Sequence, residues 1–423
     1  MWNVMNCIKF IPISIITLAI EITLFFSLPQ NWTQQSSYVV FFFVFQILLI
    51  PSVLFLFKKK FETFSVSCIL LLCANFFTPS FLPINDYKTL PPNFFKRLIV
   101  RGDVMPNFEG INTISTDEMG FRSLSDIDYN NNDSFRIFAI GASTTEEIFV
   151  DDNQTWTSLL QISLNNSQNK KFEVINTGVS GLRARHHLAT MMQTENYYPN
   201  AYIFLMGVND WNSHIKGYIG NDENELPIDL SETLIWKGLS FAKMLFSSLH
   251  FDMSEEEYNV IEEYCVTEEY CVSEEYGIYY SLQNNSLERN DVREFFPEDI
   301  DSSYESYVRW IATRCNNNSY LCIFVSQPSA YSTRLTKDLK ERLWMTPPNV
   351  EYTLDLKSLI AISQLYNQKL FEIANENNIH FCDLAKEIPP TIEYFYDDVH
   401  FNENGSTAVA EVLHGCLSTI LNE

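Results

Sequence analysis

Basic residues are scarce in this sequence: Lys and Arg together number 28 against 53 Asp and Glu, and the formal net charge is −25. The part before Pro83 holds only four cations and two acids, which leaves a net charge of −27 for the remainder. Such a surface repels phosphate backbones and anionic lipid headgroups. The composition therefore argues against nucleic acid as a partner.

Cysteine pairs with metal-site or redox spacing are also lacking. The nine cysteines include no Cys-x-x-Cys pair, which argues against a zinc ribbon or a thioredoxin-like motif. No group of His, Cys, Asp and Glu has metal-ligand spacing, so we predict neither a metal nor another cofactor. Cys315 and Cys322 flank an Asn-rich turn, and their spacing permits a disulfide in an oxidising compartment without requiring one.

The chain opens with three apolar runs: Ile8 to Leu28, Tyr38 to Phe57 and Phe64 to Leu82. Each is close to the ~20 residues that a helix needs to cross a bilayer. A cleavable signal peptide fits the first run less well, because two more runs follow and no small-residue cleavage site closes it. Buried helices of a soluble domain fit less well too, because the connections are very short. We therefore predict a membrane anchor of three transmembrane helices over residues 1–82.

The basic cluster Lys58, Lys59 and Lys60 between the second and third runs gives the orientation. Under the positive-inside rule, this cluster and the N-terminus lie on the cytoplasmic side. Everything after Leu82 is then extracytoplasmic, in the periplasm or outside the cell. The prediction is an integral membrane protein whose larger, acidic part faces away from the cytoplasm.

Residues 83–134 have the composition of a juxtamembrane lead-in, and they include the segment TDEMGFR, Thr116 to Arg122. From Phe135 onward, apolar strand patterns alternate with helical ones, which predicts βαβ units and a parallel sheet covered on both faces. We expect one α/β domain over residues 135–423. The predicted strands are Phe135 to Ala142, Phe172 to Val179, Ala201 to Val208, Tyr320 to Ser326 and Ile379 to Leu384, and the predicted helices run through Trp156 and Leu160, from Arg183 to Asn196 and from Leu354 to Asn377.

A long insertion interrupts this domain at about residues 212–303. Within it, Glu256 to Tyr279 contains four near-copies of a six-residue unit that begins Glu-Glu-Tyr. A period of six keeps Tyr on one face of a strand. We interpret the segment as an acidic surface insertion expanded by tandem duplication. A lid or partner-binding strand is the alternative, and no EF-hand spacing supports calcium binding.

Three of the predicted strands end in motifs that bear chemistry. The first ends in IGASTT and places Ser143 at the carboxyl edge of the sheet, where open α/β folds bind ligands. The second ends in NTGVSG with Gly178, whose backbone N–H a ligand can approach closely. The third ends in MGVNDW with Asn209, whose amide can donate to an oxyanion. Each motif alone also fits an ordinary helix cap or βα turn.

The fourth motif, DDVHFN, lies near the C-terminus. Asp397 and His400 are three residues apart, so on one helical turn they face the same side, and the carboxylate can orient the imidazole toward a nucleophile. Asp398 is an alternative orienting residue, and a solvated Asp/His pair is the alternative for the motif as a whole. His186 and His187 are expected to be helix residues near the rim of the site.

In their order, these four motifs resemble the blocks of the SGNH (GDSL-like) hydrolase superfamily, which carry Ser, Gly, Asn and His. The resemblance covers roughly Phe135 to the C-terminus, apart from the insertion, and it implies a flavodoxin-like three-layer sandwich. It assigns Ser143 as nucleophile, His400 as general base and Asp397 as its orienting acid, with the N–H groups of Ser143 and Gly178 and the amide of Asn209 as oxyanion hole. The first block departs from the usual Gly-Asp-Ser, because Ala142 replaces the Asp. The absence of G-x-S-x-G argues against an ordinary α/β-hydrolase.

The resemblance implies a membrane-anchored serine esterase that hydrolyses O-acyl esters, with acetyl esters on a glycan as the expected substrate. An O-acyltransferase that acts on envelope or exported polysaccharide would use the same triad. A non-catalytic anchored binding or assembly protein is the alternative from another class. Neither the acyl group nor the oligomeric state follows from the sequence.

Overall fold

A computed structural model describes residues 86–99, 105, 107–108, 111–219, 291–343, 346–348 and 350–421. The chain divides into two units, Met1–Pro79 and Ser80–Glu423, and all described residues belong to the second. The three predicted membrane spans, the Lys58–Lys60 cluster and the repeat from Glu256 to Tyr279 lie outside the described residues. Within the ranges given above, no helix is both long and apolar enough to span a bilayer.

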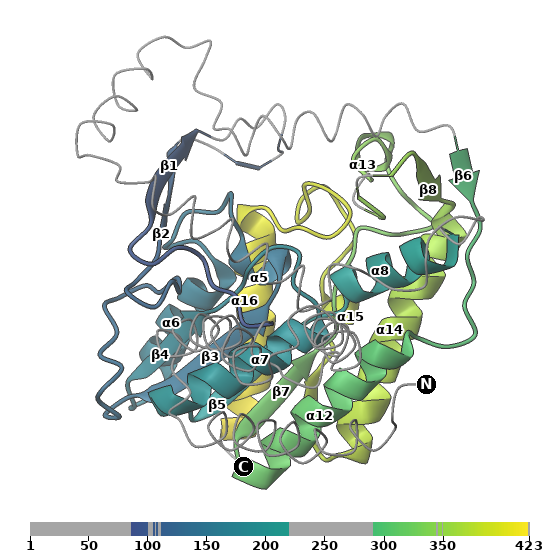
Figure 1. The fold of residues 1–423 in the computed structure, drawn as a ribbon. Coiled ribbons are helices and arrows are strands. Elements are labelled where there is room, and N and C mark those ends of the chain that lie inside the picture. Colours follow the sequence, from purple (N-terminus) through teal and green to yellow (C-terminus); the bar gives the residue numbers. More distant parts are fainter. Residues whose placement is uncertain are drawn as a thin grey trace, which may run out of the picture. The chain divides into compact units, whose positions relative to one another are not determined.

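The centre of the second unit is a five-stranded sheet in which every neighbouring pair of strands is parallel (Figure 1). Counted along the chain within this sheet, the strand order is 2-1-3-4-5, which is the flavodoxin-like order. The predicted parallel α/β sheet is thus confirmed, and each of its strands falls within a predicted one. The order across the sheet is β4 (Phe172–Asn176), β3 (Phe135–Gly141), β5 (Ala201–Leu205), β7 (Leu321–Val325) and β9 (His380–Cys382).

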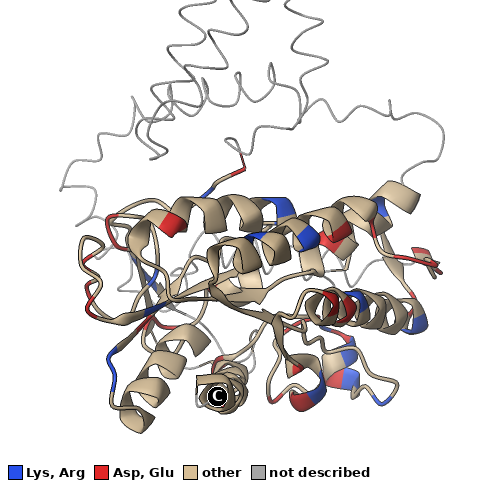
Figure 2. Cartoon of the chain, turned by 90° about the horizontal axis from the view of Figure 1, so that it is seen from below, with Lys and Arg blue, Asp and Glu red and all other residues tan. Residues whose placement is uncertain are grey.

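Helices cover both faces of the sheet, and Figure 2 shows them on either side of it. Successive strand residues point to opposite faces, so Phe138 and Ile140 enter one apolar core while Ile137 and Ala139 enter the other. Both sides of each strand are therefore apolar, as expected for a strand buried between two helical layers. One layer contains α7 (Ala184–Thr194), α12 (Ser302–Asn318) and α14 (Leu356–Glu376), and the other contains α6 (Trp156–Ser167) and α16 (Glu403–Leu421).

The shorter elements connect these layers at the ends of the strands. Two small sheets accompany the central one: an antiparallel pair, β1 (Phe95–Ile99) with β2 (Ile111–Ser115), and a parallel pair, β6 (Asp291–Arg293) with β8 (Tyr352–Leu354). The other helices of the described ranges are α5 (Ser143–Glu146), α8 (Val208–Ile219), α13 (Lys337–Lys340), α15 (Leu384–Glu387) and the 3₁₀ turn η2 (Glu195–Tyr197).

The predicted lead-in contains structure that the sequence pattern did not indicate. Besides the β1–β2 hairpin, the segment ending at Arg122 pairs with the end of β4. The Arg122 N–H donates to the Asn176 carbonyl at 3.0 Å, and the Asn176 N–H donates back to the Arg122 carbonyl at 2.9 Å. This part of the chain is therefore hydrogen-bonded to the central sheet.

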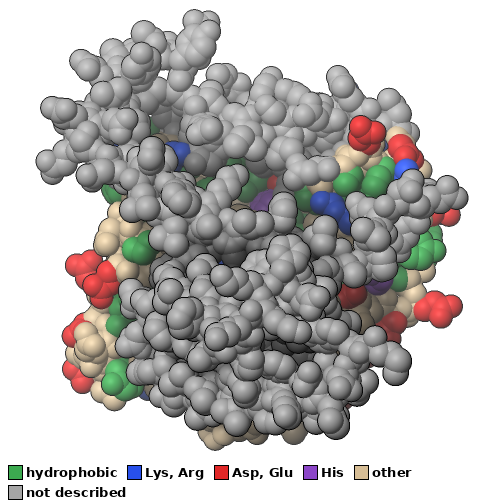
Figure 3. Space-filling view, viewed as in Figure 1, with side chains coloured by type: hydrophobic (Ala, Val, Ile, Leu, Met, Phe, Trp, Pro, Cys, Tyr) green, Lys and Arg blue, Asp and Glu red, His purple; other side chains and the backbone are tan. Residues whose placement is uncertain are grey.

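The predicted insertion starts inside a helix, because α8 continues from Val208 to Ile219. Trp211 and Ile215 are fully buried, and their spacing of four places both on the inner side of α8. The chain is described again from β6 onward, and α12 begins at Ser302. On the face in Figure 3, acidic side chains gather along both sides and basic ones are few, in keeping with the net charge.

Among the residues that the structure describes, two disulfides join helices to strands. Cys315 on α12 is bonded to Cys322 on β7, the pair whose bridging the spacing had left open. Cys382 on β9 is bonded to Cys416 on α16, 34 residues later, and no sequence pattern pointed to this bridge. Disulfides persist in oxidising compartments and are rare in the cytosol of most cells.

Candidate active site

Ser143 is the first residue of α5, directly beyond the end of β3 at the carboxyl edge of the sheet. Its Oγ lies 2.7 Å from Nε2 of His400, although the two residues are 257 positions apart in sequence. Open parallel sheets bind ligands at this edge, next to the strand where the chain order reverses. In the order 2-1-3-4-5 that strand is β3. The fold thus brings the predicted nucleophile and base together at the expected position.

Asp397 contacts the His400 ring at Nδ1, the ring nitrogen that does not face Ser143. The distance between His400 Nδ1 and Asp397 Oδ2 is 2.7 Å, and both side chains are buried. With the ring proton on Nδ1, directed at the carboxylate, Nε2 is left to accept a proton from Ser143. Ser143, His400 and Asp397 therefore form a continuous hydrogen-bonded chain.

The expected helical turn at Asp397 to His400 is wrong. The segment lies between α15 and α16 and forms a turn closed by an antiparallel bridge between Phe395 and Phe401. Asp397 Oδ1 accepts the backbone N–H groups of Val399 and His400, each at 2.9 Å. This local capping bends the chain and, in place of helical periodicity, brings the two side chains to the same side.

The surroundings of His400 favour its charged form. Burial disfavours the imidazolium, but the charge and hydrogen bond of Asp397, together with the charges of Asp398 and Glu146, outweigh this effect, so the pKa of His400 is raised above its usual 6.5. The ring also stacks on Tyr396, with centroids 5.6 Å apart and planes inclined by 11°. The site thus stabilises an imidazolium, the species that a general base becomes.

Asp398 takes a different role from Asp397. Its Oδ1 accepts the hydroxyl of Tyr331 at 3.1 Å, and its backbone carbonyl accepts the N–H of Ala330 at 2.7 Å. Of the two adjacent carboxylates, the one hydrogen-bonded to the His400 ring is therefore Asp397.

The predicted oxyanion donors lie at the same sheet edge, in different states of hydrogen bonding. The Gly178 N–H donates to Asn176 Oδ1 at 2.9 Å, and Asn209 donates one amide hydrogen to the Leu182 carbonyl at 2.9 Å. An asparagine amide has a second hydrogen to offer. The Ser143 N–H has no hydrogen-bond acceptor among the described residues. Of these predicted donors, the Gly178 N–H is thus engaged by a neighbouring side chain, whereas the Ser143 N–H is not engaged within the described residues.

Gly178 has a steric reason to be glycine. A Cβ at this position would lie 2.2 Å from the backbone nitrogen of Glu146, on the short helix that Ser143 begins. No side chain fits at that separation. Only glycine therefore lets the second motif pack directly against α5.

Three buried carboxyl groups of the site were missed by sequence reasoning, because nothing in the local pattern distinguishes them from exposed acids. Glu146 accepts the Ser180 N–H, and Glu147 accepts the Trp156 N–H at 2.8 Å and the Ser406 hydroxyl. Asp210 accepts the Ala184 N–H with both oxygens at 3.2 Å, which links α8 to the start of α7. Burial raises the pKa of all three, that of Glu147 to about 8 and that of Asp210 to about 7.

The histidines after the second motif are helix residues, as predicted, and both are buried. His186 Nδ1 accepts the Arg183 N–H at 2.9 Å, an interaction that caps α7. Burial lowers the pKa of His187 to about 3 and keeps that ring neutral. In the part of the chain that the structure describes, no group of three or more His, Cys, Asp or Glu could hold a metal ion.

No protein-family model matches the sequence, and no curated protein matches it significantly. Solved structures with a similar fold include LAE5, an alpha/beta hydrolase enzyme from the metagenome of Lake Arreo, at 13% identity and a TM-score of 0.37, covering 69% of this chain and 99% of that one. Another is Axe2, an acetylxylan esterase from Geobacillus stearothermophilus, at 14% identity and a TM-score of 0.36, covering 68% and 96%.

A protein of the G-D-S-L family from Desulfitobacterium hafniense is similar at 11% identity and a TM-score of 0.35, covering 67% of this chain and 99% of that one. With identities of 11–14% and TM-scores below 0.5, the likenesses carry no conclusion about the activity of this chain.

Proposed function

We propose that this protein is a serine ester hydrolase of the SGNH type, with Ser143, His400 and Asp397 as its catalytic triad. The observation that carries the proposal is the hydrogen-bonded chain from Ser143 Oγ through the His400 ring to Asp397, with 2.7 Å at each step. A nucleophile within hydrogen-bond reach of a base, itself oriented by a carboxylate, is the arrangement that activates serine for acyl transfer.

In the proposed reaction, His400 Nε2 takes the proton of Ser143 as Oγ attacks the ester carbonyl. Asp397 keeps the ring oriented and stabilises the imidazolium. The N–H of Ser143 and the free amide hydrogen of Asn209 stabilise the oxyanion, and Gly178 joins them if the substrate oxygen replaces Asn176 as its acceptor. His400 then protonates the leaving alcohol, and water, deprotonated by His400, releases the acyl group from Ser143.

We further propose that the enzyme is membrane-anchored and acts outside the cytoplasm on O-acetyl groups of a glycan. The apolar runs before Pro83 and the Lys58–Lys60 cluster support the anchor and its orientation. The disulfides Cys315–Cys322 and Cys382–Cys416 fit an oxidising compartment. The glycan acetate rests on the resemblance of the four motifs to SGNH hydrolases.

The test uses the full-length chain, purified in detergent, with a fluorophosphonate probe and p-nitrophenyl acetate. Wild type is expected to be labelled and to turn over, and Ser143→Ala to lose both. Ser363→Ala, which removes a buried serine hydroxyl of α14 that donates to the Ile360 carbonyl at 3.0 Å, serves as the matched control and keeps its labelling. Folded wild-type protein that never reacts with the probe would refute the serine hydrolase.

The substrate is tested separately. Acetate release from an acetylated polysaccharide is compared with hydrolysis of p-nitrophenyl butyrate and octanoate by the same preparation. Preference for the long acyl chains would contradict the acetyl assignment and leave the triad intact. Acetyl transfer to a sugar hydroxyl that outpaces hydrolysis would identify an O-acyltransferase.

A further inference from the structure

The helix that presents Ser143 is only one turn long, yet each of its four carbonyls accepts a hydrogen bond. A helix leaves its last four carbonyls without intrahelical donors, and in α5 that is most of the helix. Donors from elsewhere fill the gap. Trp156 Nε1 donates to the Thr144 carbonyl at 3.2 Å, and Asn176 Nδ2 donates to that of Thr145. The geometry of α5 is thus set by side chains outside this helix.

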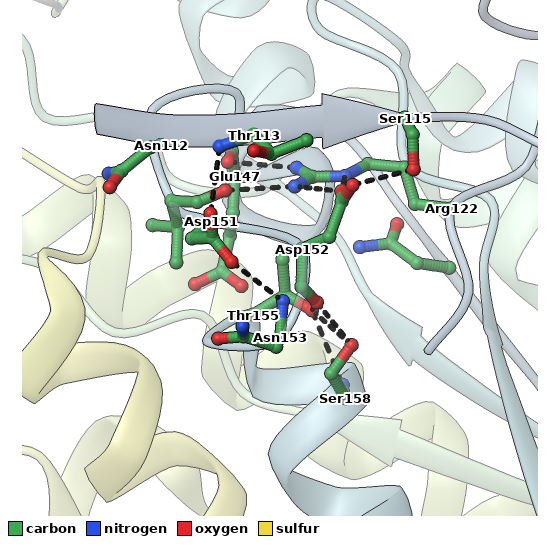
Figure 4. A network of polar contacts seen from close by, with 12 residues as sticks. Asn112, Thr113, Ser115, Arg122, Glu147, Asp151, Asp152, Asn153, Thr155 and Ser158 are labelled. Carbon is green, nitrogen blue, oxygen red and sulfur yellow. Dashed lines mark hydrogen bonds and ion pairs between the residues drawn. The ribbon is translucent and has the colours of Figure 1, made fainter. Parts of the chain in front are cut away.

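Arg122 supplies the remaining donors (Figure 4). Its Nη1 donates to the carbonyls of Glu146 and Glu147, the latter at 2.9 Å, and its Nη2 donates to the carbonyl of Val150 at 2.8 Å. The side chain is only 2% exposed. One guanidinium therefore donates hydrogen bonds to three carbonyls in the stretch that begins three residues after Ser143.

Asp152 fixes the plane of this guanidinium. Its Oδ1 accepts from Nε of Arg122 at 3.0 Å and from Nη2 at 2.8 Å, while its Oδ2 accepts the hydroxyl of Ser115 on β2 at 2.6 Å. A planar group with five donors can satisfy a carboxylate and several carbonyls at once, whereas the ammonium of Lys has only three donors on a flexible stem.

The rest of the TDEMGFR segment forms a turn that places Arg122 in this position. Asp117 Oδ1 accepts the backbone N–H groups of Met119 and Phe121, at 2.8 and 2.9 Å, and closes a turn. Gly120 has φ +79°, which side-chain-bearing residues rarely adopt, and a Cβ there would lie 2.2 Å from the Leu90 carbonyl. After the turn, Arg122 pairs through its backbone with Asn176, whose side chain engages both Thr145 and Gly178.

We propose that Arg122 is a positioning residue of the hydrolase. By donating hydrogen bonds to the carbonyls after Ser143, it holds α5 in the position that places Ser143 Oγ within hydrogen-bond distance of His400. The proposal rests on the proposed function, since it concerns the same nucleophile. No hydrogen bond of Arg122 within the described residues goes to Ser143. Arg122 acts through α5, and its loss moves the nucleophile without removing any group of the triad.

Arg136 provides a matched control. It is also a buried arginine, 2% exposed, and it binds Glu173 at 2.9 Å and the carbonyls of Tyr197 and Asp128 at 2.6 and 3.0 Å. However, it lies at the start of β3, whereas Ser143 follows the end of that strand. Arg122→Lys and Arg136→Lys therefore remove comparable interactions at opposite ends of the same strand.

The full-length variants are compared by melting temperature, by the rate of fluorophosphonate labelling and by kcat and KM for p-nitrophenyl acetate. Both substitutions are expected to lower the melting temperature. Arg122→Lys alone is expected to lower kcat and the labelling rate by roughly 10- to 100-fold, with little change in KM, because a shift of the nucleophile by about 1 Å has a cost of this order. Arg136→Lys is expected to retain the wild-type kcat.

A rescue experiment separates positioning from general stability. In Arg122→Ala, added guanidinium, well below concentrations that unfold proteins, is expected to restore part of kcat, while the matched Arg136→Ala shows no gain. Equal losses of kcat in Arg122→Lys and Arg136→Lys would overturn the inference. If the alanine variants do not fold, the comparison of the two lysine variants decides the question. Wild type that is never labelled would refute the proposed function, whereas labelled wild type with an unaffected Arg122→Lys would refute only the role of Arg122.

Discussion

Asp397 and His400 are joined twice. Asp397 Oδ2 lies 2.7 Å from Nδ1 of the His400 ring, and Asp397 Oδ1 accepts the backbone N–H of the same residue at 2.9 Å. One carboxylate therefore fixes both the ring and the main chain that carries it. Asp398, the next residue, instead accepts the hydroxyl of Tyr331. Adjacent residues of identical chemistry are thus directed to different partners.

This pair gives a prediction about pH dependence. As the proposed general base, His400 must be neutral, and its pKa is raised above 6.5, so kcat/KM is expected to rise with pH through that raised pKa. Asp398→Asn removes a charge that raises the pKa of His400 without touching its ring, so the rise should move to lower pH while the plateau is kept. Asp397→Asn removes the orienting group and should lower kcat roughly 10⁴-fold at every pH. The measurement is the pH profile of p-nitrophenyl acetate hydrolysis, and reversed behaviour of the two variants would make Asp398 the orienting acid.

Glu147 gives a prediction about stability. Burial raises its pKa in the folded protein to about 8 from 4.5, so between these values the folded state binds more protons than the unfolded state. The free energy of unfolding should therefore fall as pH rises from 5 to 8, by up to several kcal/mol at about 1.4 kcal/mol per unit of pKa shift. Glu147→Gln should flatten this fall, as measured by urea denaturation at several pH values.

Glu173 serves as the control for that measurement. Burial disfavours its carboxylate, but hydrogen bonds from Ser134, Lys171 and Arg136 outweigh this effect and lower its pKa. The stabilisation that it provides is complete above about pH 4.5 and is lost only as pH falls below that value. Glu173→Gln should therefore shift the whole curve between pH 5 and 8 without changing its slope. A fall as steep in Glu147→Gln as in wild type would contradict the assignment.

The disulfides give a prediction about their relative contributions. Cys382–Cys416 closes a loop of 34 residues that contains Asp397 and His400, whereas Cys315–Cys322 closes one of 7. Loop-closure entropy predicts a stabilisation of about 4 kcal/mol for the longer loop and about 2 kcal/mol for the shorter. Paired Cys→Ser variants are compared by thermal melting. Removal of Cys382–Cys416 should lower the melting temperature more than removal of Cys315–Cys322. A larger decrease on removal of Cys315–Cys322 would contradict the loop-length argument.

Much of the fold was predictable because its signals are local. A strand buried on both faces is apolar throughout, and the runs beginning at Phe135, Phe172 and Ala201 show this clearly. Three of the four motifs could be placed at one edge because parallel strands align their carboxyl ends. The β1–β2 hairpin was missed, since its strands are short and face solvent on one side, where residues such as Ile111 are exposed.

The parts of the site that escaped prediction depend on contacts between distant segments. Nothing near Glu146 or Glu147 in the sequence shows that their neighbours are Ser180 and Ser406. The helical turn expected at Asp397 failed for the opposite reason, because the local capping of Val399 and His400 competes with helix formation and prevails. The spans before Pro83 and the Glu256–Tyr279 repeat stay predictions.

The backbone pairing of Arg122 with Asn176 has a consequence for how this gene can be recombined. A graft that kept only Phe135 onward would retain the whole central sheet and all five predicted site residues, yet it would lose the guanidinium that binds the carbonyls after Ser143. The exchangeable module therefore begins upstream of the TDEMGFR turn. An exchange of the predicted membrane anchor would have to keep the stretch from this turn onward together with Ser143.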